Sequence, residues 1–589
     1  MCSGISRRVL AVVALAALVA APLACDSLVQ LDAGGKAKQE TPDFNGDGYA
    51  DLAVPGPLST VDGVQLAGAV SVVYGSRSGP DTEHSQVVTR ATAGTLGQLA
   101  ARGTWFGGSP VARDFDGDGF TDLAVTVSTD ADDLNGTVVL WGSSPGLSGG
   151  TTLPGGWGLH GGDFDGDGRA DLLLDNYYGS GRGDGDGPTV LFGPLSRDGK
   201  ARRKDSLGTS WGDNIVPRAI IVGDLTGDGR DDLVTSQGFE EMQERGRFFE
   251  GDEDGLKGHA SDDLNSYSAD GMIADFDGDG YGDLVVRDVG LVSEDSQDRP
   301  GELRVFRGSD SGPGSRAQRI TLKTLGLPGI DEQSGGDGFG DVLAAADVNG
   351  DGYADLAVGL PGEDTGQVSD TGAVVLLLGG KKGLTDSGAQ VITQDTPGVP
   401  GRGERGDHFG AALRTGDLNH DGHPDLAVGA PGEHGKVQQS GAVWILNGTA
   451  KGLSTTNVAS FGPAALGAPE EGYDGTEFDA KGTDFGGSFT AGEGGCVAVA
   501  PSPGGTRVKD TERNNDTAPV RAGENGSLSC ALPNDDGMSR WAVAAGIAAA
   551  VGSLLLVVRY RRRKAPYSGP VKTPWWACLE REPRPPVGQ

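Results

Sequence analysis

Seven short segments of this chain place oxygen-bearing side chains at the same regular spacing. Each follows the nine-residue pattern Asp-x-[Asp/Asn/Thr]-x-Asp-Gly-x-x-Asp. Calcium prefers six to eight oxygen ligands at about 2.3–2.6 Å, from carboxylates, amides and backbone carbonyls. The side chains at positions 1, 3, 5 and 9 and the carbonyl at position 7 can converge on an ion, because the glycine at position 6 permits a sharp turn. The pattern therefore predicts calcium-binding loops and up to seven calcium ions.

The predicted metal-ligating residues follow directly from this spacing, and the residue at position 7 contributes only its carbonyl. They are Asp43, Asn45, Asp47, Tyr49 and Asp51; Asp114, Asp116, Asp118, Phe120 and Asp122; Asp163, Asp165, Asp167, Arg169 and Asp171; Asp224, Thr226, Asp228, Arg230 and Asp232; Asp275, Asp277, Asp279, Tyr281 and Asp283; Asp347, Asn349, Asp351, Tyr353 and Asp355; Asp417, Asn419, Asp421, His423 and Asp425. We number these segments as loops 1 to 7 in chain order. Loop 4 has Thr226 at position 3, so we expect it to be the weakest site.

An EF-hand is the main alternative for a loop of this kind. An EF-hand needs Glu at position 12 and a helix on each side. Position 12 is apolar or Thr here, from Val54 in loop 1 to Val428 in loop 7, and position 10 is Leu in all seven loops. Alternation of the type Leu-x-Val indicates a strand with one buried face. The sequence thus excludes an EF-hand and predicts a hairpin loop that leads into a strand.

The segments around each loop predict a small sheet. Phe-Gly and an apolar run precede the loop, as at Phe409-Gly410, and a second apolar run follows it, as at Val443 to Gly448. A shorter run comes next, as at Gln390 to Thr393. Four short strands per repeat are typical of a propeller blade. The irregular spacing of the loops excludes a tight solenoid, and the 103 glycines recur at turn positions, which indicates turns rather than disorder.

These features resemble the FG-GAP repeats of the integrin α-subunit propeller. Phe409-Gly410, the loop from Asp417 to Asp425 and Gly429-Ala430-Pro431 match that motif best. The resemblance covers about residues 43–505. It implies an all-β fold, a seven-bladed β-propeller with calcium-binding hairpin loops on one face. Loops 3 and 5 depart from the motif, because no clear Phe-Gly precedes them and no Gly-Ala-Pro follows them.

The two ends of the repeat region predict how the ring closes. Loop 1 has no Phe-Gly segment before it, whereas an unpaired Phe485-Gly486 follows the last full repeat. We expect this C-terminal segment to complete the first blade, which removes an exposed sheet edge. The segment from Cys496 to Ala500 is then left over, so eight blades remain an alternative.

The flanking segments predict export and a membrane tether. Arg7 and Arg8 precede an apolar run, as in a secretory signal peptide. A second apolar run ends at the basic cluster from Arg559 to Lys564, which favours a cytoplasmic C-terminus. We expect a single-pass protein of the cell membrane with its propeller outside. The predicted divisions are a signal peptide at 1–24, a linker at 25–42, the propeller at 43–505, a flexible stalk at 506–538, a transmembrane helix at 539–560 and a cytoplasmic tail at 561–589.

The cysteines add two further hypotheses. Cys25 follows the end of the predicted signal peptide, so lipidation at this residue is an alternative to simple cleavage, although Pro22 argues against it. Cys496 and Cys530 lie in the exported part of the chain and could form a disulfide there.

One motif resembles a catalytic centre but recurs as a turn. Gly142 to Gly146 match the G-x-S-x-G nucleophile elbow. The equivalent turns in other repeats carry Arg77, Asp310 or Lys382 where this one has Ser144. We therefore interpret it as a repeat turn and predict no catalytic residues.

Two further groups of residues invite a functional interpretation that we do not favour. Arg182 to Asp184 and Arg405 to Asp407 spell Arg-Gly-Asp, and the second is interpreted as a connection between blades. His408, His420, His423 and His434 fall in one repeat and could bind a transition metal. We interpret them as solvated loop positions.

The overall composition limits the function. The net charge of −35 argues against a nucleic-acid partner, which needs a basic surface. The sequence outside the repeats is too short for a separate catalytic domain, so we predict that the protein is not an enzyme. We expect a cell-surface, calcium-binding propeller that acts as an adhesion or ligand-binding module, with structural calcium and an extracellular protein or glycan as ligand.

One alternative function remains open. The repeats could form the accessory propeller of an exported hydrolase or carbohydrate-binding protein. We expect no integrin-type β-subunit as partner, because the chain has no inserted domain and no leg-like region.

Overall fold

The structure is a computed structural model. It describes residues 41–91, 103–127, 136–156, 158–175, 188–207, 216–239, 242–264, 266–290, 302–327, 330, 338–473 and 482–489. The predicted signal peptide, stalk, membrane span and tail lie outside these segments, as do Cys25, Cys496 and Cys530. Within the described segments, no helix has the length and apolar character that a membrane span requires.

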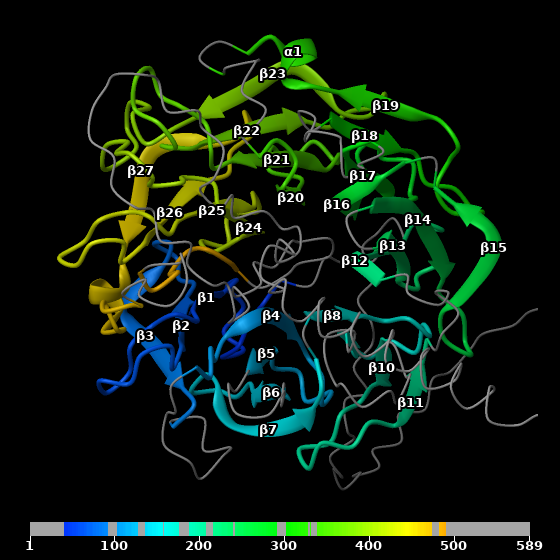
Figure 1. The fold of residues 1–589 in the computed structure, drawn as a ribbon, viewed down its shortest axis with the longest axis horizontal. Coiled ribbons are helices and arrows are strands. Elements are labelled where there is room, and N and C mark those ends of the chain that lie inside the picture. The colour runs from blue at the N-terminus through cyan, green and yellow to red at the C-terminus, as the bar shows by residue number, and fades with distance from the viewer. Residues whose placement is uncertain are drawn as a thin grey trace, which may run out of the picture.

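Seven antiparallel sheets stand side by side in a ring (Figure 1), which confirms the predicted seven-bladed propeller. We number them as blades 1 to 7 in chain order. Blades 1 to 3 contain β1 (Leu52–Gly56), β2 (Ala69–Tyr74) and β3 (Asp81–Thr89); β4 (Gly108–Arg113), β5 (Asp122–Val127), β6 (Gly136–Trp141) and β7 (Ser148–Pro154); β8 (Gly158–Gly162), β9 (Asp171–Asp175), β10 (Thr189–Phe192) and β11 (Arg203–Ser206). Blades 4 and 5 contain β12 (Val216–Gly223), β13 (Asp232–Phe239), β14 (Met242–Glu250) and β15 (Lys257–Asp263); β16 (Ser268–Ala274), β17 (Asp283–Asp288), β18 (Glu302–Phe306) and β19 (Ala317–Ile320).

The last two blades show the four-strand unit most regularly. They contain β20 (Val342–Ala346), β21 (Asp355–Leu360), β22 (Ala373–Leu378) and β23 (Thr385–Ile392); β24 (Ala412–Gly416), β25 (Asp425–Ala430), β26 (Ala442–Asn447) and β27 (Ser454–Phe461). Strands pair in chain order, so that Val428 lies opposite Leu413 on one side and Trp444 on the other. The described helices are only α1 (Leu322–Leu325) and the 3-10 turn η2 (Pro463–Leu466).

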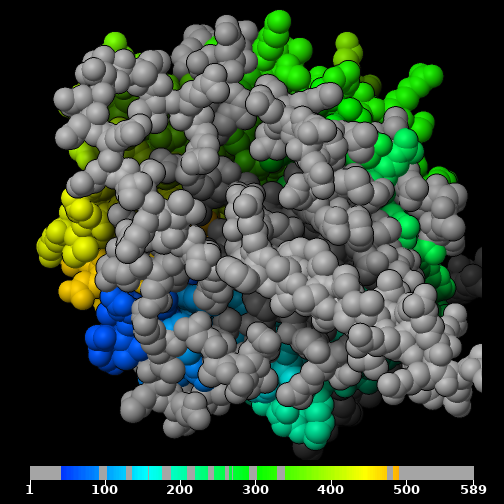
Figure 2. All heavy atoms as spheres, viewed as in Figure 1, coloured from blue at the N-terminus to red at the C-terminus, as the bar shows by residue number. Residues whose placement is uncertain are grey.

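The hydrophobic core is divided among the interfaces between blades. Each pair of neighbouring blades buries its own apolar cluster, and seven such clusters run around the ring. The residue at position 2 of each loop anchors this core, as Phe44 and Phe115 do with no exposed surface. The last strand of a blade is more exposed, as in β23. Coloured, described residues appear along the outer edge of the molecule in the space-filling view (Figure 2).

The seam between blades 7 and 1 closes the ring. Leu52 and Val54 of blade 1 share a buried cluster with Ala427 and Ile445 of blade 7, and Phe485 joins it. Burial of apolar surface at this seam removes the open edge that a linear array of sheets would have.

The segment around Phe485 takes the place expected of a Phe-Gly segment of blade 1. A Cβ on Gly441 would lie 2.1 Å from the Phe485 carbonyl oxygen, just as one on Gly372 would lie 2.2 Å from that of Phe409. The Leu58 N–H of blade 1 donates to the Thr483 carbonyl at 3.2 Å. Blade 1 has three described strands, and the residues that would continue from this segment lie beyond the described part.

Candidate metal centres at the blade loops

The seven acidic loops lie at one end of the blades. Each leads into the second strand of its blade, and in blade 1 that strand is β1. The Leu at position 10 is fully buried in the strand, as Leu426 is in β25. Strands and not helices flank the loops, which confirms the hairpin prediction and the exclusion of an EF-hand.

The carboxylate at position 1 holds the loop in its curled shape. Oδ1 of Asp43 accepts hydrogen bonds from the N–H groups of Gly46 at 2.7 Å and Asp47 at 3.1 Å, and Oδ2 accepts one from Gly48 at 2.9 Å. The N–H of Tyr49 at position 7 donates to Oδ1 of Asp47 at 3.0 Å. The bonds from positions 5 and 6 to position 1, and from position 7 to position 5, recur in all seven loops.

The Asp at position 9 is buried beneath the loop. Oδ1 of Asp425 accepts from the N–H of Gly448 at 3.0 Å, and Oδ2 accepts from Leu418 at 3.2 Å. Burial is the largest cause that raises the pKa of Asp425 to about 7, with further contributions from the neighbouring loop carboxylates. The same causes raise the pKa of Asp122 in loop 2 to about 8. A bound cation would oppose this shift, because a nearby positive charge favours the ionised carboxylate.

The donor set of the loops fits a hard divalent cation. In three loops, three carboxylates each offer an oxygen within 4.8 Å of the others: Asp114, Asp116 and Asp122; Asp163, Asp165 and Asp171; Asp275, Asp277 and Asp279. Oδ1 of Asp165 is buried without a hydrogen-bond partner, whereas Oδ2 of the same carboxylate contacts Arg202 at 2.5 Å and Arg203 at 3.2 Å. Oxygen ligands of this kind suit calcium or magnesium. Which ion each loop holds stays a prediction.

The loops also pack on one another, a feature that the sequence analysis missed. The side chain at position 7 covers the glycine at position 4 of the preceding loop, and a Cβ on that glycine would come within 2.6–2.9 Å of it. These pairs are Phe120 on Gly46, Arg169 on Gly117, Arg230 on Gly166, Tyr281 on Gly227, Tyr353 on Gly278 and His423 on Gly350. Tyr49 and His420 complete the circle with an edge-on contact, their ring centroids 5.7 Å apart. The recurrence of glycine at position 4 was the available signal.

Backbone hydrogen bonds link the same loops. The N–H at position 8 donates to the carbonyl at position 1 of the preceding loop in five of the seven junctions. These bonds are Thr121 to Asp43, Asp231 to Asp163, Gly282 to Asp224, Ala354 to Asp275 and, across the closing seam, Ala50 to Asp417. Loop 7 has Pro424 at position 8 and lacks the N–H. The loops therefore form one connected rim rather than seven independent turns.

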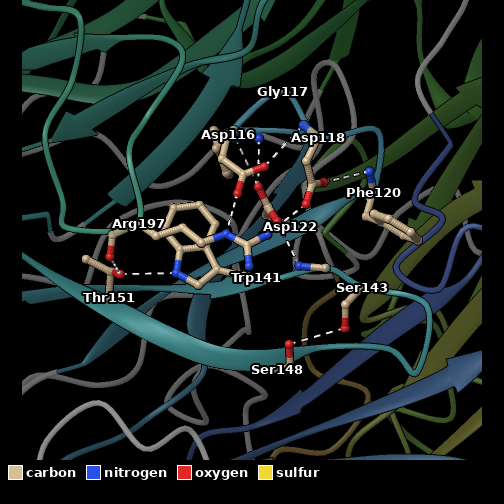
Figure 3. Close-up of polar contacts among 12 residues, drawn as sticks. Asp116, Gly117, Asp118, Phe120, Asp122, Trp141, Ser143, Ser148, Thr151 and Arg197 are labelled. Atoms are coloured by element: carbon tan, nitrogen blue, oxygen red, sulfur yellow. Dashed lines mark hydrogen bonds and ion pairs between the residues drawn. The ribbon is translucent and has the colours of Figure 1, made fainter. Parts of the chain in front are cut away.

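Arginine side chains reach several of the loops. In loop 2, Nε of Arg197 lies 2.6 Å from Oδ2 of Asp116 and Nη2 lies 2.7 Å from Oδ2 of Asp118 (Figure 3). The guanidinium stands over the ring of Trp141, 5.6 Å from its centroid. Sequence analysis found the acidic residues of loop 2 but not this basic partner, because Arg197 is 81 residues from Asp116 along the chain.

Two motifs that resemble functional sites have structural roles in the described residues: the Gly142 to Gly146 turn and the second Arg-Gly-Asp tripeptide. The N–H of Gly146 donates to the Ser143 carbonyl at 2.6 Å, and the equivalent bond joins Gly79 to Ser76 at 2.8 Å, so the Gly142 to Gly146 segment is a repeat turn. Asp407 is fully buried in a connection between blades, which removes it from any Arg-Gly-Asp surface. Arg182 to Asp184 lie outside the described residues.

The four histidines of the last repeat are spread over different contacts. His420 and His423 lie in loop 7, whereas Nδ1 of His408 contacts the Pro361 carbonyl at 3.1 Å and Nδ1 of His434 contacts that of Gly432 at 2.8 Å. Among the described residues they form no clustered metal site.

Known proteins with similar sequences include integrin alpha chains and a phospholipase D, and a model of the FG-GAP repeat matches three of the blades. The family model of the FG-GAP repeat matches residues 41–73, 336–377 and 409–446, which contain loops 1, 6 and 7. The phosphatidylinositol-glycan-specific phospholipase D of Bos taurus is 34% identical over 186 residues, 29% of this chain and 19% of that protein. Integrin alpha-PS5 of Drosophila melanogaster is 37% identical over 119 residues, 20% of this chain and 10% of that protein. Integrin alpha-IIb of Mus musculus is 36% identical over 166 residues, 27% of this chain and 14% of that protein. The chain thus spans less than a fifth of the length of these relatives.

Proposed function

We propose that this chain, which carries FG-GAP repeats in a seven-bladed β-propeller, is an exported ligand-binding module whose loops hold calcium as a structural ion. The observation that carries this proposal is the difference between the two ends of the blades. One end repeats the same loop seven times, and the other end varies from blade to blade.

The loop end is suited to stability rather than to catalysis. Its carboxylates accept backbone hydrogen bonds within their own loops, and each loop packs on its neighbour through the side chain at position 7. Residues at positions 1, 3, 5 and 9 and the carbonyl at position 7 would hold the ion. Calcium bound there would add its binding free energy to that of folding.

The opposite end offers a variable surface for a ligand. Residues 57–68, 361–372 and 431–441 make long connections between the second and third strands, whereas in blade 4 β13 ends at Phe239 and β14 begins at Met242. The long connections are ordered by their own contacts, as where the N–H groups of Thr365 and Val368 donate to each other's carbonyls at 3.0 and 3.2 Å. Variable connections on a rigid scaffold are a common basis for recognition. We infer an extracellular protein or glycan as ligand.

The similarity to integrin alpha chains supports an adhesion role at the cell surface. That role also rests on the predicted signal peptide and membrane span. We propose that the propeller acts without an integrin-type β-subunit.

Binding can be tested on the full chain with arrays of extracellular proteins and glycans, followed by titration of each hit. The matched control replaces the tip of one variable connection: residues 365–368 are exchanged for a two-residue turn. This leaves all seven loops intact, and it keeps the carbonyls of Ser369, Asp370 and Thr371, which accept the N–H groups of Gly406, His408 and Phe409. We expect the exchange to weaken binding at least tenfold with an unchanged melting temperature. Failure to bind any array component, or binding that the exchange leaves unaltered, contradicts the proposed ligand face.

A hydrolase-associated role is the second candidate, and the similarity to phospholipase D favours it. It predicts release of a phosphatidylinositol-glycan-anchored reporter by the full chain, or retention of the reporter on the propeller. We expect neither, and release above the rate in a buffer control would support this candidate over a binding module.

A further inference from the structure

The seven loops differ in where their positive charge comes from. In loops 2 to 5, an arginine of the chain contacts the loop carboxylates. The contacts are Arg197 on Asp116 and Asp118, Arg202 on Asp165 and Asp167, Arg203 on Asp165, Arg230 on Asp228, and Arg307 on Asp277. Among the described residues, no arginine or lysine pairs with the carboxylates of loops 1, 6 and 7. Those three loops have an amide at position 3, namely Asn45, Asn349 and Asn419.

The arginines take the carboxylate oxygens that face away from the loop backbone. Oδ1 of Asp118 accepts the N–H of Phe120 at 3.0 Å, and Oδ1 of Asp116 accepts the N–H of Asp118 at 3.2 Å. Arg197 contacts the Oδ2 atom of each. In loop 5 the N–H of Asp279 donates to Oδ1 of Asp277, and Arg307 takes Oδ2. The carboxylates that the arginines contact at positions 3 and 5 are therefore predicted metal ligands.

The arginine over loop 2 is held in place from the neighbouring blade. Arg197 belongs to the turn between β10 and β11, and its carbonyl accepts the hydroxyl of Thr151 at 2.6 Å. Oγ1 of Thr151 in turn accepts Nε1 of Trp141 at 3.1 Å. Trp141 also lies under the guanidinium of Arg197 (Figure 3). In the same way Phe192 lies beneath Arg203, 3.7 Å from the guanidinium carbon to the ring centroid. Two contacts with residues of blade 2 therefore hold Arg197 beside the loop, and a hydrogen bond between Trp141 and Thr151 links those two residues to each other.

One strand position shows how blade 5 supplies a positive charge that blades 6 and 7 lack. Arg307 directly precedes Gly308, whose N–H donates to Oδ1 of the position 9 carboxylate of loop 5. In blades 6 and 7 the residue before the equivalent glycine is Leu378 or Asn447. An arginine at this point reaches the loop of its own blade, and leucine or asparagine does not provide the charge.

Net charge alone does not distinguish the loops. In loops 2 and 5 one arginine offsets the extra carboxylate at position 3, so the formal charge equals that of loops 1, 6 and 7. The location of the charge does distinguish them, because a guanidinium that lies on one or two of the predicted ligand carboxylates must move before a divalent ion can use them. Two like charges within a few ångströms also repel strongly where water is partly excluded.

We propose that arginine side chains are the resident counter-ions of loops 2 to 5, and that calcium binds tightly only to loops 1, 6 and 7. This inference rests on the calcium sites of the proposed function and specifies which of them are used. It makes Arg197, Arg202, Arg203, Arg230 and Arg307 residues that determine metal stoichiometry.

Calcium titration of the full, chelator-stripped chain by calorimetry tests the inference by counting tightly bound ions. We expect about three ions per chain. Arg307→Leu, which copies blade 6, should raise the count by about one. The control is Arg77→Leu, because Arg77 is exposed in a blade 1 turn and pairs with no loop carboxylate there; its count should equal that of the wild type.

The reverse variant, Asn447→Arg, tests the same inference independently, in case Arg307→Leu fails to fold. It places an arginine beside loop 7, and we expect it to lower the count by about one. Circular dichroism of each stripped variant verifies that it is folded. Seven equivalent ions in the wild type, or an unchanged count in both Arg307→Leu and Asn447→Arg, overturn this inference and leave the proposed function intact. A wild-type chain that binds no calcium overturns the proposed calcium sites and this inference together.

Discussion

Blades 1, 6 and 7 and blades 2 to 5 build the same loop with different charge partners. In both groups the position 1 carboxylate binds the N–H groups at positions 5 and 6, so the loop backbone is the same. Only the second group places a guanidinium on the outward carboxylate oxygens. The comparison teaches that the loop shape comes from its own hydrogen bonds, whereas its counter-charge can be recruited from elsewhere. The family model matches only the first group.

Removal of calcium should produce the largest difference in stability between loops 1, 6 and 7 and loops 2 to 5. At a calcium concentration one hundred times Kd, each occupied loop gains about 2.7 kcal/mol from binding. We expect a chelator to lower the melting temperature, and to speed amide hydrogen exchange about 100-fold in loops 1, 6 and 7. Loops 2 to 5 should change by less than about threefold. Equal deprotection in all seven loops would contradict the division, and magnesium-free buffer without chelator serves as the control.

The pH dependence of the stripped protein should be the next largest effect. Burial raises the pKa of the position 9 carboxylates, to about 7 for Asp51 and Asp425 and to about 8 for Asp122, from 3.8. Between these values the folded chain binds protons that the unfolded chain has released, so the free energy of unfolding falls as pH rises. Without calcium the melting temperature should therefore decrease from pH 5 to pH 8.

Added calcium should flatten this trend, because the ion favours the charged carboxylates that high pH produces. Melting curves in calcium and in chelator at each pH supply the comparison. A melting temperature that stays level with pH in chelator would show that these carboxylates ionise in the folded chain as they do in the unfolded chain, and one that rises would show that folding lowers their pKa.

Matched substitutions at position 5 sharpen the comparison at single loops. Asp421→Asn in loop 7 removes a predicted calcium ligand, and we expect a loss of about 2–3 kcal/mol in calcium. Asp118→Asn in loop 2 breaks an exposed pair with Arg197 and should cost about 1 kcal/mol or less. Chemical denaturation in calcium and in chelator measures both, and the difference between the variants should vanish in chelator. Similar costs under all conditions would argue against calcium in loop 7.

Substitutions at position 4 should differ least in their cost between the two groups of blades, because both groups pack one loop on the next. A Cβ on Gly278 would meet Tyr353 at 2.8 Å, and one on Gly350 would meet His423 at 2.8 Å. Gly278→Ala and Gly350→Ala should each cost about 2 kcal/mol from overpacking and a positive φ. Gly352→Ala is the control, since it has a φ of 90° but open space, and should cost about 1 kcal/mol. Unequal costs at Gly278 and Gly350 would show that the rim is not uniform.

Local patterns were sufficient to predict the blades. The Leu at position 10 and the absence of Glu at position 12 distinguished a strand from a helix, and Leu426 is indeed buried in β25. The unpaired Phe485-Gly486 predicted closure, and Phe485 lies in the seam with Leu52 and Val54. These signals succeed because they depend on side-chain alternation and on glycine, which act over a few residues.

Contacts between blades could not be predicted in the same way. Arg197 reaches Asp116 across 81 residues, and nothing in the local sequence specifies that distance in space. The role of Tyr49 against His420 likewise depends on the ring being closed, since the two residues belong to the first and last loops. Residues that contact a loop of another blade could therefore be identified only from the structure.

The closing seam also determines how the molecule would carry a mechanical load. The described propeller begins and ends at blade 1: Asp51 donates to the Pro42 carbonyl at 2.6 Å, and Phe485 is buried beside Leu52. Tension on the chain beyond residue 489 would therefore pull first on the junction of blades 7 and 1. Loops 1 and 7 flank this junction, and the Ala50 to Asp417 hydrogen bond crosses it at 3.3 Å. Both loops lack an arginine partner among the described residues, so if they hold the proposed calcium ions, the rupture force of the ring would follow the calcium concentration.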